Sequence, residues 1–271
     1  MPKRPLIVIK GAGDLATGVA YRLYQSRLDV IMTEINRPLV VRRKVAFAEA
    51  VHDGMAVVEG ITAKLAVTVD HACELLEDRI IPVLVDPEAD VVKVLRPQVV
   101  VDARVAKRNL GTAIDEAPLV IGLGPGFTAG QDVHAVIETC RGHRLGRVIY
   151  SGSAIPDTGS PGSVGGFTVE RLLRAPADGV VMTTRSIGEI VEKGEIVAVV
   201  ENNPVRAQIT GKIRGMIKEG IRVPKGTKIG DIDPRKDAEH DTISDKALAV
   251  GGGVLEAVFS FILADNNAWC N

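Results

Sequence analysis

The residues best suited to chemistry lie near the start of the chain, in a glycine-rich run between an expected strand at 6–9 and an expected helix. The run reads Gly11-Ala-Gly-Asp-Leu-Ala16, which has the strand-to-helix spacing of a phosphate-binding turn. In such a turn Gly11 permits the sharp bend, Gly13 lets the backbone approach a pyrophosphate, and the small Ala16 lets helix and strand pack closely. The amides at the helix N-terminus would then face the phosphates.

Of two acidic residues near this run, one favours a bound nucleotide and the other disfavours it. Glu34 stands at the end of the second expected strand, where a carboxylate can accept a hydrogen bond from a ribose hydroxyl. Asp14 stands in the first helical turn, where its charge would complement the helix dipole and repel a phosphate. We expect a dinucleotide-binding loop, and the alternative is a self-capped helix without a ligand. The predicted ligand-binding residues of this loop are Gly11, Gly13, Asp14, Ala16, Gly18 and Glu34.

A second glycine-rich run follows the expected strand at 119–121 and precedes an expected helix that carries Asp132, His134 and Glu138. Parallel strands end at one edge of a sheet, so both runs are expected to line one crevice. The segment 102–108 ends another strand, and its basic residues would suit an anionic ligand. A tight loop without ligand contact and a solvated helix start are the alternatives. The predicted ligand-binding residues here are Gly122, Gly124, Gly126, Gly130, Asp102 and Arg104.

No catalytic residue can be selected from the sequence, and no nucleophile motif is present. The candidates for a general base are Glu34, Asp102, Glu138 and His143. The pairs His71/Cys73 and Cys140/His143 each lack the second pair that a zinc site requires, so we expect no metal site. Whether the chain is an enzyme stays open.

Short β-branched runs alternate with helical stretches up to about residue 150, which predicts a parallel sheet covered by helices. The expected strands are 6–9, 30–33, 81–85, 99–102, 119–121 and 148–150. We therefore expect an α/β fold whose first domain, residues 1–150, is Rossmann-like. In the next segment, 151–166, 11 of 16 residues are Gly, Ser or Pro, which indicates a linker or a functional loop.

Beyond this segment the sequence repeats itself with an offset of 32 residues. The repeated positions are Gly179, Gly188, Val191, Lys193 and Gly194, which return as Gly211, Gly220, Val223, Lys225 and Gly226. Two such β-units would bury their apolar faces only together, so residues 167–235 are expected to form one small all-β domain. The remaining segment, 236–271, is expected to hold a helix from Ser244, its N-cap, to about Ala264.

Charge and composition exclude several kinds of partner. The formal net charge is -1, from 33 basic and 34 acidic residues, so no strong field exists to attract nucleic acid or an anionic membrane surface. The longest apolar stretch, 254–264, falls short of the roughly 20 residues that a membrane span needs. Three widely spaced cysteines fit a reducing compartment. We therefore expect a soluble, cytoplasmic protein.

Motifs spread over nearly the whole chain carry a family resemblance. They are Gly11-Ala-Gly-Asp-Leu-Ala-Thr-Gly18, Met32-Thr-Glu-Ile35, Gly122-Leu-Gly-Pro-Gly-Phe127, His134-Ala-Val-Ile-Glu-Thr139, Arg141-Gly-His143, Ile229-Gly-Asp-Ile-Asp-Pro-Arg235 and Gly251-Gly-Gly-Val-Leu-Glu256. With them the chain resembles the YqeB-type accessory proteins of selenium-dependent molybdenum hydroxylases. Its first domain is also similar to the Rossmann part of the XdhC/CoxI accessory proteins.

This resemblance implies a role in the maturation of molybdenum hydroxylases of the xanthine dehydrogenase type, which would be the protein partner. The implied ligand is the molybdenum cofactor, a pterin dinucleotide whose pyrophosphate would suit the loop at 11–16, or NAD. The likeness names a pathway and supplies no catalytic residues. The alternatives are a free-standing NAD-dependent oxidoreductase and a carrier or scaffold built on the second domain.

The second domain resembles the biotinyl/lipoyl-like barrel-sandwich fold in the placement of Ala175, Pro176, Gly179 and Gly194. Carriers of that fold bear a modified lysine on the hairpin between their two halves. Here the hairpin reads Glu201-Asn-Asn-Pro204 and contains no lysine, so no lipoyl or biotin group is expected.

Overall fold

The computed structural model describes residues 4–157, 159 and 162–266, and the chain divides into two compact units. The first unit takes residues 1–36, 46–157 and 243–271, and the second takes 37–45 and 158–242. The chain therefore passes between the units several times, and its C-terminal helix belongs to the first unit.

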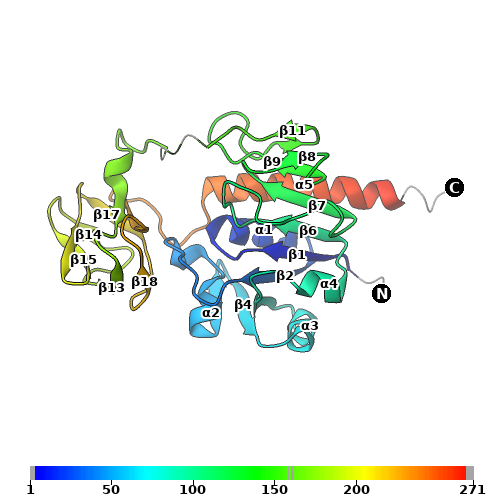
Figure 1. Ribbon diagram of the computed structural model, residues 1–271, viewed down its shortest axis with the longest axis horizontal. Helices are drawn as coiled ribbons and strands as arrows, with labels where there is room; N and C mark the ends of the chain where they lie inside the picture. Colours follow the sequence, from blue (N-terminus) through cyan, green and yellow to red (C-terminus); the bar gives the residue numbers. More distant parts are fainter. Residues whose placement is uncertain (1–3, 158, 160–161, 267–271) are drawn as a thin grey trace. The chain divides into compact units, whose positions relative to one another are not determined.

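A nine-stranded sheet forms the centre of the first unit (Figure 1). Its strands lie in the order β10-β9-β7-β6-β1-β2-β5-β4-β3. The inner strands, from β9 to β4 in this order, run parallel. Their bounds are β1 Leu6–Lys10, β2 Asp29–Glu34, β3 Met55–Val58, β4 Ile61–Ala66, β5 Ile81–Val85, β6 Val99–Asp102, β7 Leu119–Leu123, β9 Ala135–Ile137 and β10 Val148–Ile149.

Helices cover both faces of this sheet, because successive side chains of each strand point to opposite faces. The helices are α1 Asp14–Gln25, α2 Glu49–Asp53, α3 Val69–Glu77, α4 Val91–Leu95 and α5 Asp245–Asn266. Two short 3-10 turns, η1 Arg43–Val45 and η2 Val169–Arg171, belong to the second unit. On one face Val8, Ile31, Val100 and Val120 pack with buried residues of α3 and α4. On the other face α1 contacts β1 and β2, and α5 contacts α1, β7, β9 and β10 (Figure 1).

The expectation of a purely parallel, Rossmann-like sheet is wrong, because both edge strands run antiparallel to their neighbours. β3 pairs with β4 through a turn in which Glu59 and Gly60 have φ of 45° and 78°. β10 pairs with β9 after the connection 138–147. Both connections are shorter than the crossover of roughly a dozen or more residues that a parallel neighbour needs. The sheet is therefore large and mixed.

The expectation of a helix after the second glycine-rich run is also wrong, because this segment forms a strand. Asp132 Oδ2 accepts a hydrogen bond from the Thr128 amide at 2.8 Å, which closes a turn directly after β8 (Thr128–Ala129). The buried residues of β9 then extend beside β7. β8 itself pairs with β11 (Gly152–Ser153) in a separate two-stranded sheet. Turn chemistry at Asp132 thus decided the local structure.

The C-terminal helix is confirmed, and Ser244 caps it as expected. Ser244 Oγ accepts a hydrogen bond from the Ala247 amide at 3.2 Å, and α5 begins at the next residue, Asp245. By length and composition alone, 20 residues of α5 could cross a membrane. Of the apolar window of this helix 39% is buried, including Val250 and Val254, and α5 packs on α1 and the sheet.

Two four-stranded antiparallel sheets make up the second unit, in the orders β12-β19-β17-β14 and β16-β15-β13-β18. Their bounds are β12 Leu172–Arg174, β13 Gly179–Thr183, β14 Ile190–Val191, β15 Ile196–Val200, β16 Asn203–Arg206, β17 Gly211–Met216, β18 Arg222–Val223 and β19 Lys228–Asp233. β17, β18 and β19 begin 32 residues after β13, β14 and β15. β14 pairs with β17 and β18 pairs with β13, so each half of the repeat lends a strand to the other half's sheet.

The expectation of a biotinyl/lipoyl-like barrel-sandwich is also wrong, because the strands form two open sheets. β12 and β16 are terminal strands of the two sheets and do not pair with each other. Pro204 in β16 has no amide hydrogen to donate to a ladder across this gap. The two sheets enclose an apolar core that includes Leu173, Val181, Val197 and Ile213.

Candidate functional site

The carboxyl ends of the parallel strands bring the predicted site residues to one edge of the large sheet. In the strand register Lys10 lies between Asp102 and Thr33, and Asp102 lies next to Gly122. From β1 the chain continues to β2 on one side, whereas β6 is added later on the other side. Open α/β sheets bind ligands where the strand order reverses in this way. The first glycine loop, residues 11–13, stands at this point.

The two glycines of the first loop have different structural roles. Gly11 has φ of 98°, and a Cβ there would lie 3.3 Å from the Ala103 carbonyl oxygen, so the turn and the close approach both require glycine. Gly13 is the N-cap of α1 with φ of -66°, and no side chain caps the helix there. A Cβ on Gly13 would meet nothing within 4 Å. The space in front of Gly13 is therefore open to a ligand.

The carboxylate of Glu34 holds the first loop by accepting hydrogen bonds from backbone amides. Its Oε2 accepts a hydrogen bond from the Ala12 amide at 2.9 Å, and its Oε1 accepts one from the Ile35 amide at 2.8 Å. The Gly11 amide also donates, to the Thr33 carbonyl at 2.8 Å, so two of the three amides of the loop are occupied by the protein itself. The half-buried carboxylate keeps lone pairs that could still accept from a ligand hydroxyl.

Of the remaining residues predicted for the first loop, Ala16 and Gly18 are packed inside the protein, whereas Asp14 is half-buried. Ala16 is fully buried between α1 and the sheet. Gly18 faces α5, where a Cβ would stand 2.6 Å from Ala247 Cβ, so helix packing explains this glycine without a ligand. Asp14 is half-buried in the first turn of α1. Its negative charge remains the feature that disfavours a bound phosphate.

The second glycine loop is filled by the protein's own atoms. A Cβ on Gly122 would lie 2.5 Å from the Phe127 ring. The corresponding distances are 2.5 Å from Gly124 to Thr139 Oγ1 and 2.7 Å from Gly126 to Arg108 Cα. Of the four predicted glycines here, Gly130 is the one with open space around it. β6 also separates this loop from the first. Close packing therefore accounts for most of these glycines, as in the alternative interpretation.

Asp102 and Arg104 form a buried charge network with residues that the sequence did not single out. Arg104 donates to Asp102 through Nε at 3.1 Å and NH2 at 2.5 Å, and the Thr112 hydroxyl donates to Asp102 Oδ2 at 2.7 Å. Lys10 donates to Thr112 Oγ1 at 2.9 Å and lies 2.6 Å from a carboxylate oxygen of Glu116. The network ties the segment after β6 to the end of β1.

Electrostatics keep Asp102 ionised despite its burial. Burial by itself raises the pKa of Asp102, but the hydrogen bonds and positive charge of Arg104, with the Thr112 hydroxyl, lower that pKa below its ordinary value. An ionised carboxylate whose oxygens are held by two partners is a poor general base. Asp102 is therefore positioned to hold the segment after β6 against the end of β1 and not to take up a proton.

A cation missed by sequence reasoning, Lys246, lies within electrostatic range of Asp14, the first residue of α1. It is half-buried in the first turn of α5, and among the described residues no hydrogen bond or ion pair engages it. Burial lowers the pKa of Lys246 and the charge of Arg141 lowers it further, while Asp14, Cys140 and Glu138 raise it. No motif surrounds this lysine in the sequence, so tertiary packing was needed to find it.

The other candidates for a general base do not converge on the first loop. The buried Glu138 accepts hydrogen bonds from the Cys140 amide at 2.7 Å and the Ile155 amide at 2.8 Å, which is a structural role. His143 is exposed. Within the described ranges no three His, Cys, Asp or Glu side chains gather as a metal site would require.

Comparisons with solved structures give only weak likenesses. An aspartoacylase family protein from Mesorhizobium loti is 11% identical, with 85% of each chain covered and a TM-score of 0.28. A succinylglutamate desuccinylase/aspartoacylase from Rhodobacter sphaeroides is 14% identical, covering 85% of this chain and 86% of that one, with a TM-score of 0.27. Scores this low carry no conclusion about fold or activity.

A comparison of sequences gives a much closer relative. No family model matches the chain. The chain is 52% identical over 254 residues, 93% of its length, to the protein YqeB of Escherichia coli (strain K12). It covers 47% of that relative, so the chain spans about half the length of the curated protein that it matches. Over the matched residues, the chain is therefore similar to about half of YqeB.

Proposed function

We propose that this chain binds a dinucleotide-type ligand at the loop of residues 11–13, and that it serves as an accessory protein in the maturation of molybdenum hydroxylases. The observation that carries the binding proposal is the open, uncapped start of α1 at Gly13. It lies where the strand order reverses, between β1 and β6. Backbone amides at a helix N-terminus suit a pyrophosphate. The ligand would be the molybdenum cofactor in its pterin dinucleotide form, or NAD.

The charges around the loop support an anionic ligand of limited charge. Lys246 offers a cation without an ion pair among the described residues, and the N-terminus of α1 offers a partial positive charge. Asp14 opposes both. A pyrophosphate that bridges two sugars carries fewer charges than a terminal triphosphate, so a dinucleotide fits this balance better than a nucleoside triphosphate.

The accessory role rests on the family resemblance and on the YqeB relative. The protein partner would be a molybdenum hydroxylase of the xanthine dehydrogenase type, and the place of action would be the cytoplasm. A pull-down of the tagged chain from its native cell is expected to retain such a hydroxylase or its cofactor. Recovery of neither, from cells that make an active hydroxylase, would contradict the accessory role.

The binding proposal is tested by calorimetric titration with NAD, NADH and molybdopterin dinucleotide. Gly13→Val is expected to abolish binding and preserve the fold, because its Cβ would enter open space at an ordinary backbone φ. Gly252→Val makes the same change in α5, where nothing lies within 4 Å, and should bind like the parent. Equal affinity of a folded Gly13→Val variant and the parent would contradict the proposal.

A second candidate is an NAD-dependent oxidoreductase. The observation in its favour is Glu34, whose carboxylate adjoins the loop where the ribose of NAD would lie. An oxidoreductase would consume NADH with a small carbonyl substrate, whereas an accessory protein would bind a dinucleotide without turnover. Absorbance at the nicotinamide band, followed with a panel of aldehydes and ketones, separates the two functions.

A further inference from the structure

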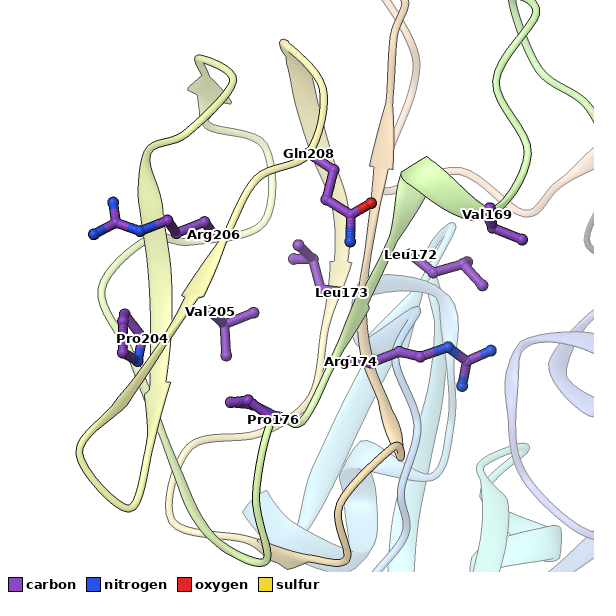
Figure 2. A pocket seen from close by; sticks show the side chains of 9 residues that line it. All are labelled: Val169, Leu172, Leu173, Arg174, Pro176, Pro204, Val205, Arg206 and Gln208. Carbon is purple, nitrogen blue, oxygen red and sulfur yellow. The ribbon is translucent and has the colours of Figure 1, made fainter.

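Two open sheet edges face each other across a cavity in the second unit. β12 and β16 are the terminal strands of the two four-stranded sheets, and they contact each other without forming a ladder. Between them lies a cavity of about 310 Å³ (Figure 2). This volume falls at the lower end of the range of roughly 300–1,000 Å³ that is typical of binding sites.

The cavity has apolar walls and cationic flanks. Leu173 and Val205 point into the gap, and Pro176 and Pro204 close it at one end (Figure 2). Arg174 stands on β12 and Arg206 on β16, and their side chains point away from the gap on its two sides (Figure 2). No acidic residue lines the cavity within the part of the chain that the structure describes. The chemistry of the lining therefore selects an apolar group accompanied by negative charge.

Both arginines are held in place and keep donors to spare. Arg174 NH1 donates to the Gly226 carbonyl at 2.8 Å, and Arg206 NH1 donates to the Gly194 carbonyl at 2.8 Å. A guanidinium has five N–H groups, so the others can reach a carboxylate. Because one bond already fixes each side chain to the protein, less side-chain entropy is lost when an anion binds.

We propose that this groove binds an extended, acidic peptide segment of a partner protein, which adds to the edge of β12. An open edge presents unpaired backbone groups that an extended peptide can satisfy. Alternate amides of β12 point away from its partner β19 to the free edge, whereas Pro204 removes a donor from β16, so β12 is the better template. An apolar side chain of the peptide would fill the cavity beside Leu173 and Val205. Neighbouring carboxylates would pair with Arg174 and Arg206.

The test measures fluorescence anisotropy of labelled eight-residue peptides with the full chain. One peptide alternates leucine or valine with glutamate or aspartate, a second replaces the acidic residues by lysine, and a third is the acidic peptide with alternate amides N-methylated. The acidic peptide should bind at least about tenfold more tightly than the other two, because they lack the charge pairs or the strand hydrogen bonds. Comparable binding of the acidic and lysine peptides would overturn the proposal, as would no binding by the acidic peptide up to millimolar concentration.

Charge-reversal variants locate the site. Arg174→Glu and Arg206→Glu should each weaken binding of the acidic peptide by about tenfold and strengthen binding of the lysine peptide. Arg222→Glu reverses an exposed arginine of β18 that does not line the cavity, and should leave both affinities unchanged. Equal losses in all three variants would place the binding elsewhere and overturn the proposal. A circular dichroism spectrum that matches the parent serves as the fold control for each variant, because all three substitutions lie in the second unit.

Discussion

Gly18 and Gly251 lie back to back where α1 crosses α5. A Cβ on Gly251 would stand 2.6 Å from the Gly18 carbonyl oxygen, and a Cβ on Gly18 would stand 2.6 Å from Ala247 Cβ. Arg22, one turn further along α1, also meets α5, because its Nε donates to the Leu248 carbonyl. Residues 18 and 22 thus both meet the segment 247–251, so the two helices pack closely at this point.

This close crossing predicts opposite effects for two neighbouring glycines of α5. Gly251→Ala should destabilise the protein by about 2 kcal/mol, because the methyl group would overlap α1 backbone. Gly252→Ala should stabilise it by roughly 0.5–1 kcal/mol, because nothing lies within 4 Å and alanine favours a helix. Urea unfolding measures both free energies of unfolding. Equal changes for the two variants would mean that the helices do not cross as described.

Substitutions in the second glycine loop should lower the free energy of unfolding rather than the affinity for a ligand. Gly126→Ala should lower the free energy of unfolding by about 3 kcal/mol, from the positive φ and from the overlap with Arg108. Gly130→Ala has the positive φ without the overlap and should cost about 1 kcal/mol. Thermal unfolding followed by circular dichroism compares them. A Gly126→Ala variant that keeps full stability and loses ligand affinity would restore the loop as a binding element.

The Asp102 network predicts a loss of stability in acid. Since the folded-state pKa of Asp102 is lowered, this carboxylate contributes stability above its unfolded pKa of about 3.9, and the contribution disappears as the pH falls through the folded value. Asp102→Asn should cost about 3 kcal/mol at pH 7, because Arg104 loses its ionic partner. The variant should also show a flatter dependence of stability on pH below about pH 4. The same acid slope in variant and parent would assign the loss to other carboxylates.

Lys246 should contribute to ligand affinity and not to stability. Lys246→Met is expected to weaken dinucleotide binding by about tenfold and to leave the free energy of unfolding at pH 7 unchanged or higher, since a half-buried cation without a partner is removed. Lys246→Arg, which keeps the charge, should retain most of the affinity. Because the pKa of Lys246 is lowered in the folded state, stability of the parent should rise as the pH rises toward about 10.4, the unfolded value. The Met variant should lack this rise.

Much of the strand content could be read from the sequence, because buried parallel strands are short β-branched runs. The expected strands at 6–9, 81–85 and 99–102 match β1, β5 and β6 to within a residue. β3 and β4 were not expected, although Glu59 and Gly60 between them are typical of a tight hairpin turn. The segment at β9 was mistaken for a helix because its apolar residues are too few to define a period.

The sequence by itself determined the turn at Gly11, the cap at Ser244 and the 32-residue repeat, because each depends on residues close together in the chain. Only the tertiary structure decided which glycines face a ligand and which face the protein. Gly13 is open, whereas Gly18, Gly122, Gly124 and Gly126 meet atoms of residues that are up to 229 positions away, as in the contact of Gly18 with Ala247. The same is true of Lys246, which comes within electrostatic range of Asp14 because α5 packs on α1. Local spacing specifies backbone geometry, but the atoms that fill the space beside a backbone come from distant segments brought together by burial of the core.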